Sequence, residues 1–192
     1  MTISPNYGTY HHTSAGQSEN IRKELRKAFY EMFEIMDRTD TVNWILDAGC
    51  GLGYLCEVSA FFFKNAKVTG VDLFGTSSLP EGNMQKAIKN MEAVGLESRV
   101  NFFRSDLLKP VLPADSIDLC VSSLVFHNLG GERFKAYSNI FEILRKNGYF
   151  IVGDFFMKGS DRGFLKELFS IVKVKENIRN MPEQYSILVL RK

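Results

Sequence analysis

The sequence of 192 residues lacks the features that mark several special classes of protein. It has no apolar run long enough to cross a bilayer and no basic-then-apolar leader, so we expect a cytoplasmic protein with no membrane partner. It has only three cysteines, all in apolar stretches and without a C-x-x-C pair. Cys50, Cys56 and Cys120 are therefore predicted to be free buried thiols.

Neither sign of charge dominates the chain. The 24 Lys and Arg residues nearly balance the 22 Asp and Glu residues, which gives a net charge of +2. This balance provides no strong electrostatic attraction to nucleic acid, so nucleic acid is not expected as a partner. The hydrophobic fraction of 45% is ordinary for a globular protein, and residues 1–192 are predicted to form one domain. The oligomeric state is left open.

One stretch, Ile45–Gly53 with the sequence ILDAGCGLG, organises the rest of the chain. An apolar run reaches Asp47, glycines follow at alternate positions, and a helical pattern begins at about Tyr54. This order predicts a buried strand, a tight turn and a helix N-terminus. Glycines let the backbone approach a ligand closely, so the turn suits a nucleotide-like ligand at the ends of parallel strands.

The spacing of the glycines separates two kinds of nucleotide site. A dinucleotide fingerprint requires G-x-G-x-x-G or G-x-G-x-x-A, but the last position here is Tyr54 or Cys56. The form acid-x-Gly-x-Gly-x-Gly instead resembles the first motif of the class I S-adenosylmethionine (SAM)-dependent methyltransferases. The resemblance extends over roughly residues 42–154.

Alternating strands and helices predict a doubly wound α/β sheet with helices on both faces. The predicted strands are 42–47, 66–72, 99–106, 116–123, 149–154, 170–175 and 185–190, and the predicted helices are 18–37, 54–64, 81–94, 132–146 and 160–169. The resemblance implies a seven-stranded, mostly parallel sheet in the order 3-2-1-4-5-7-6, with the seventh strand antiparallel.

Two further acids follow predicted strands. Asp72 lies 21 positions after Gly51, close to the spacing of an acid that accepts hydrogen bonds from ribose hydroxyls. SAM and nicotinamide cofactors both contain ribose, so Asp72 does not distinguish them. The resemblance implies that Asp106 accepts from the adenine amine and that Leu107 packs on the ring; Leu73 is included in the same cofactor site.

The resemblance also implies how the donor end of the cofactor is held. Gly49, Cys50, Gly51 and Gly53 would seat its methionine portion. Asp47 would lie near the ammonium group through water, and the backbone near Ser122 would lie close to the sulfonium.

The candidate catalytic residues follow the fourth predicted strand. His127 either removes a proton from the substrate or only shapes the pocket, and Asn128 can hold a polar group of the substrate. Asp154 ends the fifth strand and can also reach the substrate. The chain has neither the Asn/Asp-Pro-Pro-aromatic nor the Pro-Cys signature of DNA-base methyltransferases, and no metal site is predicted.

The N-terminus contains Tyr7, Tyr10, His11 and His12 among polar residues and turn formers. It is either a loose arm or a flap over the ligand. Ser18 is the predicted N-cap of the first helix. Residues 1–40 are thus a possible lid.

Three functions remain at this point. The first is SAM-dependent methyl transfer by in-line displacement to a small molecule or a protein side chain, with the class of acceptor unknown. The second is a catalytically inactive methyltransferase-like binding subunit, and the third is a nicotinamide-dependent oxidoreductase.

Overall fold

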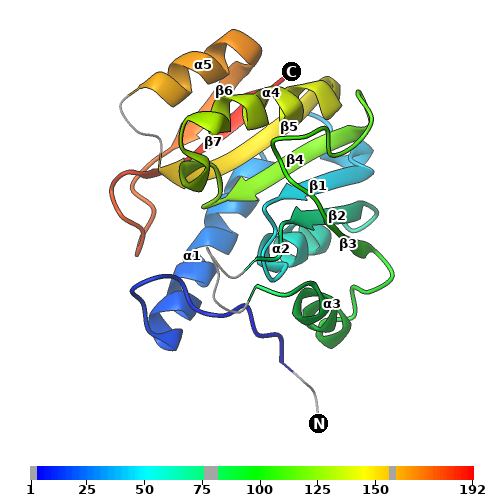
Figure 1. Ribbon diagram of the computed structural model, residues 1–192, viewed down its shortest axis with the longest axis vertical. Coiled ribbons are helices and arrows are strands. Elements are labelled where there is room, and N and C mark those ends of the chain that lie inside the picture. The colour runs from blue at the N-terminus through cyan, green and yellow to red at the C-terminus, as the bar shows by residue number, and fades with distance from the viewer. Residues whose placement is uncertain (1–3, 76–81, 156–158) are drawn as a thin grey trace.

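The computed structural model describes residues 4–75, 82–155 and 159–192, which form a sheet covered by helices on both faces (Figure 1). The strands are β1 (Trp44–Ala48), β2 (Lys67–Asp72), β3 (Val100–Arg104), β4 (Ile117–Ser123), β5 (Leu144–Phe155), β6 (Ser170–Lys175) and β7 (Tyr185–Arg191). They follow the order β3-β2-β1-β4-β5-β7-β6, and β7 runs antiparallel to both its neighbours. The predicted sheet order is confirmed.

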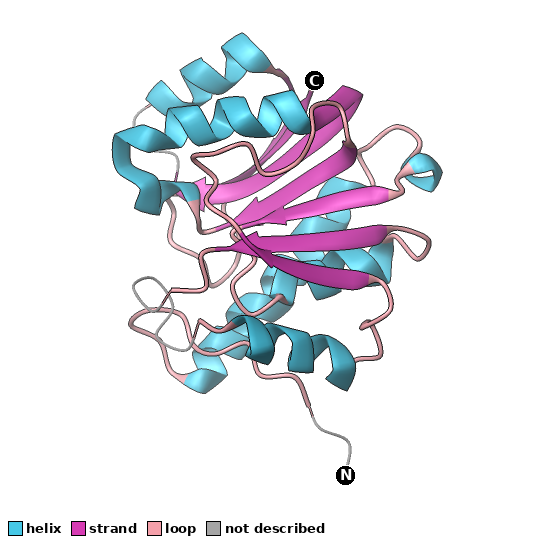
Figure 2. Cartoon of the chain, turned by 45° about the vertical axis from the view of Figure 1, so that its right-hand side comes forward, coloured by secondary structure: helices cyan, strands magenta, loops and turns pink. Residues whose placement is uncertain are grey.

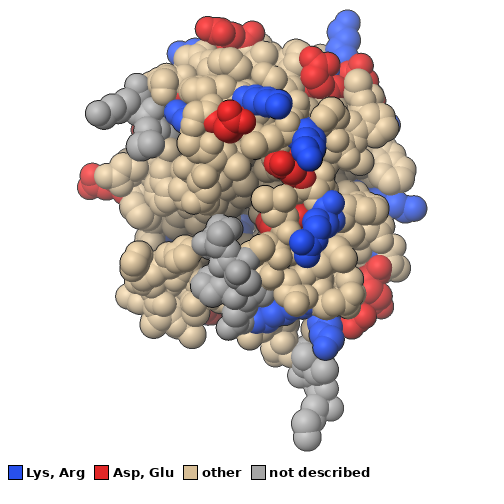
Figure 3. Space-filling model, viewed as in Figure 1, with Lys and Arg blue, Asp and Glu red and all other residues tan. Residues whose placement is uncertain are grey.

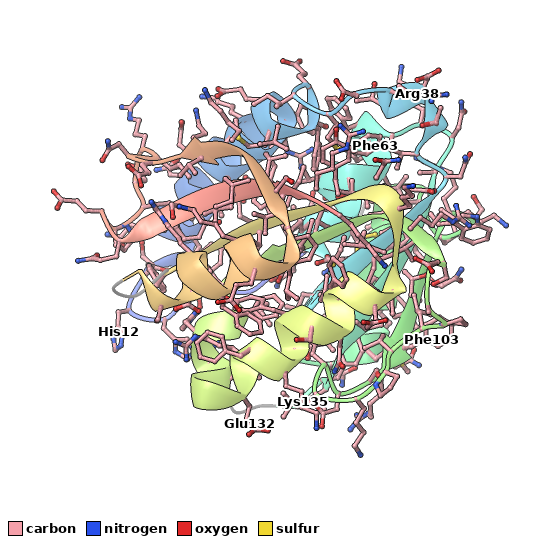
Figure 4. All side chains as sticks on the ribbon, turned by 90° about the horizontal axis from the view of Figure 1, so that it is seen from above. His12, Arg38, Phe63, Phe103, Glu132 and Lys135 are labelled. Carbon is pink, nitrogen blue, oxygen red and sulfur yellow. The ribbon has the colours of Figure 1, made fainter. Side chains whose placement is uncertain are left out.

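The helices form two layers. One layer contains α1 (Ala15–Phe33), α2 (Tyr54–Phe62) and α3 (Met84–Ala93); the other contains α4 (Arg133–Ile143), α5 (Ser160–Leu168) and the 3₁₀ helix η2 (Phe126–Glu132). A further 3₁₀ turn, η1, spans Thr39–Thr41. Figure 2 shows α4 and α5 above the sheet and the first three helices beneath it. In Figure 4, viewed from above, α4 and α5 lie in the foreground.

The central strands are buried on both faces, which explains their continuous apolar runs. Successive side chains of a strand point to opposite faces. Ile45 therefore packs in the cluster beneath the sheet, and Leu46 packs in the cluster above it. The same alternation separates Ile151 from Val152 in β5.

The N-cap of the first helix lies four residues earlier than predicted, at Ser14 and not at Ser18. The Ser14 hydroxyl accepts a hydrogen bond from the Gln17 amide at 3.3 Å, and the Gln17 side chain accepts one from the Ser14 amide at 2.8 Å. This pair is a capping box. Ser18 is buried inside the helix, and its hydroxyl accepts a hydrogen bond from the Tyr10 amide at 3.0 Å.

The prediction was also wrong at the end of α4, which was expected to continue to residue 146. The helix ends at Ile143, and β5 begins directly at Leu144, which pairs with Ile117 of β4. Strand pairing therefore takes over before Asn147, whose φ of 66° lies in the left-handed region.

Among the described residues, no helix is both long enough and apolar enough to cross a membrane. The cytoplasmic location stays a prediction.

The capping box generates a test of the revised helix start. Replacing Ser14 with Ala should lower the free energy of unfolding by about 1 kcal/mol, since one amide at the helix start loses its partner. Ser160→Ala is the comparison, because Ser160 lies in the first turn of α5, where the N-cap is Gly159. Urea unfolding measures both, and a Ser14→Ala variant as stable as the natural protein would contradict the assignment.

Candidate functional site

The turn between β1 and α2 follows a path that a side chain at residue 49 would block. Gly49 has φ of 76°, and a Cβ there would lie 2.5 Å from Val125 Cγ1. The amides of Gly49 and Cys50 donate to the carbonyl oxygen of Val71 at 2.8 and 3.0 Å. The turn is thus fixed between the end of β2 and the segment after β4.

Asp72 is the last residue of β2 and Asp106 follows β3, at the same edge of the sheet. The Asp72 carboxylate accepts hydrogen bonds from the amides of Gly51 at 3.0 Å and Phe74 at 2.7 Å, one on each oxygen. The Asp106 carboxylate accepts one from the Leu108 amide at 3.0 Å. These bonds fix both carboxylates, and each oxygen has a further lone pair with which it can accept from a ligand.

Asp47 lies at the end of β1 and is 1% exposed. The Cys56 thiol donates to its carboxylate at 3.0 Å. Burial, with a smaller contribution from the negative charge of Asp72, raises the pKa of Asp47 to about 7. A nearby cation would lower that pKa again, since an opposite charge favours the ionised carboxylate.

These groups surround one pocket of about 480 Å³. Ten of the predicted site residues line it: Asp47, Gly49, Cys50, Gly51, Asp72, Leu73, Asp106, Leu107, His127 and Asn128. The structure therefore brings together acids from three strand ends, the glycine turn and the segment after β4. The role of each residue stays a prediction.

Two predicted residues, Gly53 and Ser122, lie outside the lining of this pocket. Gly53 is buried at the start of α2, where a Cβ would lie 3.0 Å from Phe102 Cζ. The Ser122 hydroxyl donates to the carbonyl oxygen of Ala48 at 2.7 Å, so it links β4 to β1. The next residue, Ser123, lines the pocket in its place.

The Ser123 hydroxyl lies 2.9 Å from the hydroxyl of Tyr185, a fully buried residue of β7. Tyr185 can reach Ser123 only because β5 has a glycine between them. A Cβ at Gly153 would overlap with the Tyr185 ring, with only 2.8 Å to its Cζ. No pattern in the sequence signals this contact, because it joins three different strands.

His127 is held by Asp154, which the sequence analysis placed in the substrate site. Nδ1 of His127 lies 2.6 Å from one carboxylate oxygen of Asp154, and the other oxygen accepts from the amides of Val125, Phe126 and His127 at 2.7–3.3 Å. The Asp154 side chain is 2% exposed, whereas that of His127 is 27% exposed. An ionised carboxylate only accepts hydrogen bonds, so Nδ1 carries the proton and Nε2 has the lone pair.

Asn128 is exposed at the rim of the pocket. Its side-chain amide donates to the carbonyl oxygen of Leu124 at 3.4 Å, a weak bond that a ligand group can replace.

The N-terminal segment, residues 4–14, packs against the body of the protein. Backbone groups of Asn6 exchange two hydrogen bonds with the Asn90 side chain, at 2.8 and 2.9 Å. The Tyr7 hydroxyl donates to Glu57, which also pairs with Arg26. Figure 4 shows His12 at the periphery, pointing away from the protein.

Arg22 of α1 holds this segment in place. It is 6% exposed, and its guanidinium donates to the carbonyl oxygens of Tyr7, at 3.0 Å, and Gly8. The guanidinium carbon lies 5.2–6.0 Å from the ring centres of Tyr7, Tyr10 and Tyr54, within the range of cation–π attraction. Tyr7 and Tyr10 both line the pocket, so the segment forms part of its wall.

Other lining residues carried no sequence signal. Phe155 follows Asp154 at the end of β5, and Met181 and Pro182 come from the loop between β6 and β7. They look like ordinary apolar and loop residues in the sequence, and only the fold brings them to the pocket.

All three cysteines are free and buried, as predicted. Cys50 lines the pocket, but burial raises the pKa of its thiol to about 11. The thiol therefore stays protonated near neutral pH and is a weak nucleophile.

The buried carboxyl of Asp47 should make stability depend on pH. The native side chain keeps its proton up to about pH 7, whereas the unfolded one loses it at about pH 4. The native state therefore binds more protons in this window, and the free energy of unfolding should fall as pH rises through it, by at most about 4 kcal/mol.

The Asp47→Asn variant should lack this part of the pH dependence, as measured by urea unfolding between about pH 4 and pH 8. Asp40→Asn is the control for removal of an exposed carboxylate. Parallel stability curves for the natural protein and the Asp47→Asn variant would show that burial of Asp47 does not affect its titration.

Comparisons with known proteins agree with this geometry. A family model described as a methyltransferase domain matches residues 46–152, more than half of the chain. The chain is 25% identical over 170 residues to the malonyl-[acyl-carrier protein] O-methyltransferase of Bacillus anthracis, a match that covers 87% of this chain and 57% of the relative. It is 26% identical over 103 residues to the U6 snRNA (guanine-N(2))-methyltransferase THUMPD2 of Homo sapiens, covering 54% of this chain and 18% of the relative.

The crystal structure of an S-adenosylmethionine-dependent methyltransferase from Mesorhizobium loti has the same fold, with a TM-score of 0.62 at 19% identity. The likeness covers 84% of this chain and 96% of that one. Both curated relatives are longer than the matched region, since the chain spans 18% and 57% of their lengths. The family match confirms the predicted family and its cofactor, S-adenosylmethionine. The chain belongs to the methyltransferase-domain family of class I S-adenosylmethionine-dependent methyltransferases.

Proposed function

We propose that this protein transfers the methyl group of SAM to an acceptor by in-line displacement. The observation that carries the proposal is a single pocket with two differently built ends. One end has the glycine turn, Asp72 and Asp106, and the other has Ser123 and His127. A space beside Ser123 and His127 favours turnover over the inactive binding subunit, which would need no acceptor cavity. The glycine spacing disfavours the oxidoreductase.

The residues at the first end fit the cofactor. A Cβ at Gly49 would overlap Val125, so the turn presents bare backbone to the methionine portion. Asp72, with both oxygens oriented by amides, would accept from the ribose hydroxyls. Asp106 and Leu107 would take the adenine, with Leu73 beside them. Asp47, at the pocket floor, would ionise to face the ammonium group.

The residues at the second end would prepare the acceptor. When bound, SAM supplies a methyl group on a positively charged sulfur. Nε2 of His127 would take the proton of the attacking group, while Asp154 holds the ring and stabilises the resulting imidazolium. Asn128 and Ser123 would orient the attacking atom. The protein otherwise contributes alignment of the two reactants and exclusion of water.

The N-terminal segment would act as a lid. Tyr7 and Tyr10 line the pocket, and the fastenings through Asn90 and Arg22 support a flap over a loose arm. Residues 1–192 would then function as one methyltransferase domain with residues 1–40 as its cover.

A change at Asp72 tests the cofactor site without knowledge of the acceptor. Asp72→Ala should weaken binding of S-adenosylhomocysteine by about 1–3 kcal/mol, the usual cost of leaving buried hydrogen-bonding groups unpaired. Isothermal titration calorimetry measures this directly, with NAD(P)H as a second ligand that should not bind the natural protein.

Asp118→Ala is a matched control for Asp72→Ala. Asp118 also accepts two backbone amide bonds, from Asn43 at 3.0 Å and Trp44 at 2.9 Å, but at the opposite edge of the sheet. The Asp118→Ala change should leave the affinity for S-adenosylhomocysteine unchanged. If the natural protein and the Asp72→Ala variant bind S-adenosylhomocysteine with equal affinity, the ribose assignment is refuted. If neither protein binds S-adenosylhomocysteine, the proposed function is refuted.

The proton-transfer role is tested at His127 and Asp154. His127→Ala should lower the rate with a hydroxyl acceptor by about 10²–10⁴-fold, while binding of S-adenosylhomocysteine stays the same. Asp154→Asn should cause a smaller loss and raise the fraction of the Nε2-protonated tautomer of His127 in ¹⁵N NMR spectra. A variant without His127 that keeps the full rate and pH profile would leave the residue with a shaping role only.

A further inference from the structure

We propose that the methyl acceptor is an uncharged, mainly apolar small molecule that is methylated on a phenolic hydroxyl. This inference rests on the proposed function and adds the substrate class. Three features of the pocket end near Ser123 and His127 support it. The walls there are apolar, the charged side chains there are already paired within the protein, and His127 is the base that faces this end.

The walls of this end are mostly aliphatic and aromatic. They come from α1, the N-terminal segment, the end of β5 and the loop before β7. The side chains are those of Tyr10, Ile21, Leu25, Phe29, Phe155 and Met181. Such walls stabilise an apolar ligand by removing it from water, at about 25 cal/mol per Å² of surface.

The charged groups near this end already have partners within the protein. Arg22 is the one Lys or Arg in the described lining. Its guanidinium bonds to the carbonyl oxygens of Tyr7 and Gly8 and lies among three tyrosine rings. Glu57, beneath Tyr7, pairs with Arg26. A substrate carboxylate or phosphate would thus find no Lys or Arg in the described lining except Arg22, whose guanidinium is already bonded, and an unpaired charge is costly in an apolar site.

The surface around the pocket agrees with an uncharged substrate. In Figure 3, acidic and basic side chains gather mainly on the right of the face shown. The left part, where the N-terminal segment and the loop before β7 lie in Figure 1, has few of them. The described pocket lining contains a single Lys or Arg, Arg22, whereas contact with a nucleic-acid backbone would require several cations.

The imidazole base, His127, determines which kind of hydroxyl group can be methylated. The proton of the acceptor moves to Nε2 of His127, its oxygen forms a bond to the methyl carbon, and the electrons of the breaking carbon–sulfur bond go to sulfur. An imidazole removes a proton readily from a phenol, whose pKa is about 10, and poorly from an aliphatic alcohol, whose pKa is several units higher. The rings of Phe155 and Tyr10 give a flat aromatic acceptor favourable contacts.

Three probes with one ring system separate these requirements: 2-naphthol, 2-naphthoate and 2-naphthylmethanol. Each is titrated into the complex of the full chain with S-adenosylhomocysteine, and each is incubated with SAM and followed by mass spectrometry of the methylated product. We expect 2-naphthol to bind at least about 100-fold more tightly than 2-naphthoate, the cost of an unpaired charge in an apolar site. We expect it to be methylated at least about 100-fold faster than 2-naphthylmethanol.

A pair of variants tests whether a cation added to the pocket wall changes the preference for an uncharged ligand. Met181→Arg places a cation at the pocket wall and should reverse the preference toward 2-naphthoate, whereas Gln184→Arg adds the same charge in the same loop outside the described lining and should not. Both should keep their affinity for S-adenosylhomocysteine, which also reports that they are folded.

The outcomes distinguish this inference from the proposed function. Three results overturn the substrate class and leave the proposed function in place, provided that S-adenosylhomocysteine binds. They are a preference for 2-naphthoate, faster methylation of 2-naphthylmethanol than of 2-naphthol, and turnover of none of the three probes. Failure to bind S-adenosylhomocysteine at all overturns the proposed function itself.

Discussion

The absence of a side chain at residue 49 is the constraint on which the site depends. With φ of 76° and Val125 packed against its Cα, Gly49 lets the chain turn sharply from β1 into α2. That path brings two amides onto the carbonyl oxygen of Val71 and a third onto Asp72. The ends of β1, β2 and β4 therefore meet around one crevice, at the point where the strand order reverses, as in other doubly wound sheets.

The charged side chains at the two ends of this crevice have different bonding partners. Near the glycine turn, carboxylates are oriented by backbone amides and keep lone pairs for a ligand. At the other end, Arg22 and Glu57 form hydrogen bonds with the N-terminal segment. Their charges are therefore directed at the protein itself, and the walls that face the pocket there are mostly apolar. The interactions that hold this wall in place thus also occupy the charged groups that a charged substrate would need, which supports the substrate class proposed above.

The position of His127 depends on Asp154, a residue 27 positions later in the chain. Asp154, at the end of β5, accepts from three consecutive amides of the segment after β4 and from the imidazole itself. One carboxylate therefore sets both the path of the segment and the tautomer of the ring. Ser123 is fixed in a similar way by Tyr185 of β7, through the space left by Gly153. The side of the pocket with Ser123 and His127 is therefore fixed by contacts among strands β4, β5 and β7.

The sequence by itself determined the sheet order, through the family resemblance, and most of the residues that line the glycine-turn end of the pocket. It did so because a glycine turn and the acids at strand ends are local features, each readable within a few residues. It misplaced the start of the first helix, because a cap is identified by the backbone amide that its side chain bonds, and the Gln17 amide bonds Ser14. Tertiary structure alone decided that Ser122 ties β4 to β1, that Asp154 holds His127, and that Met181 and Phe155 close the far wall. Those contacts join residues far apart in the chain, and a side chain's partner across such a distance is set by packing and not by local pattern.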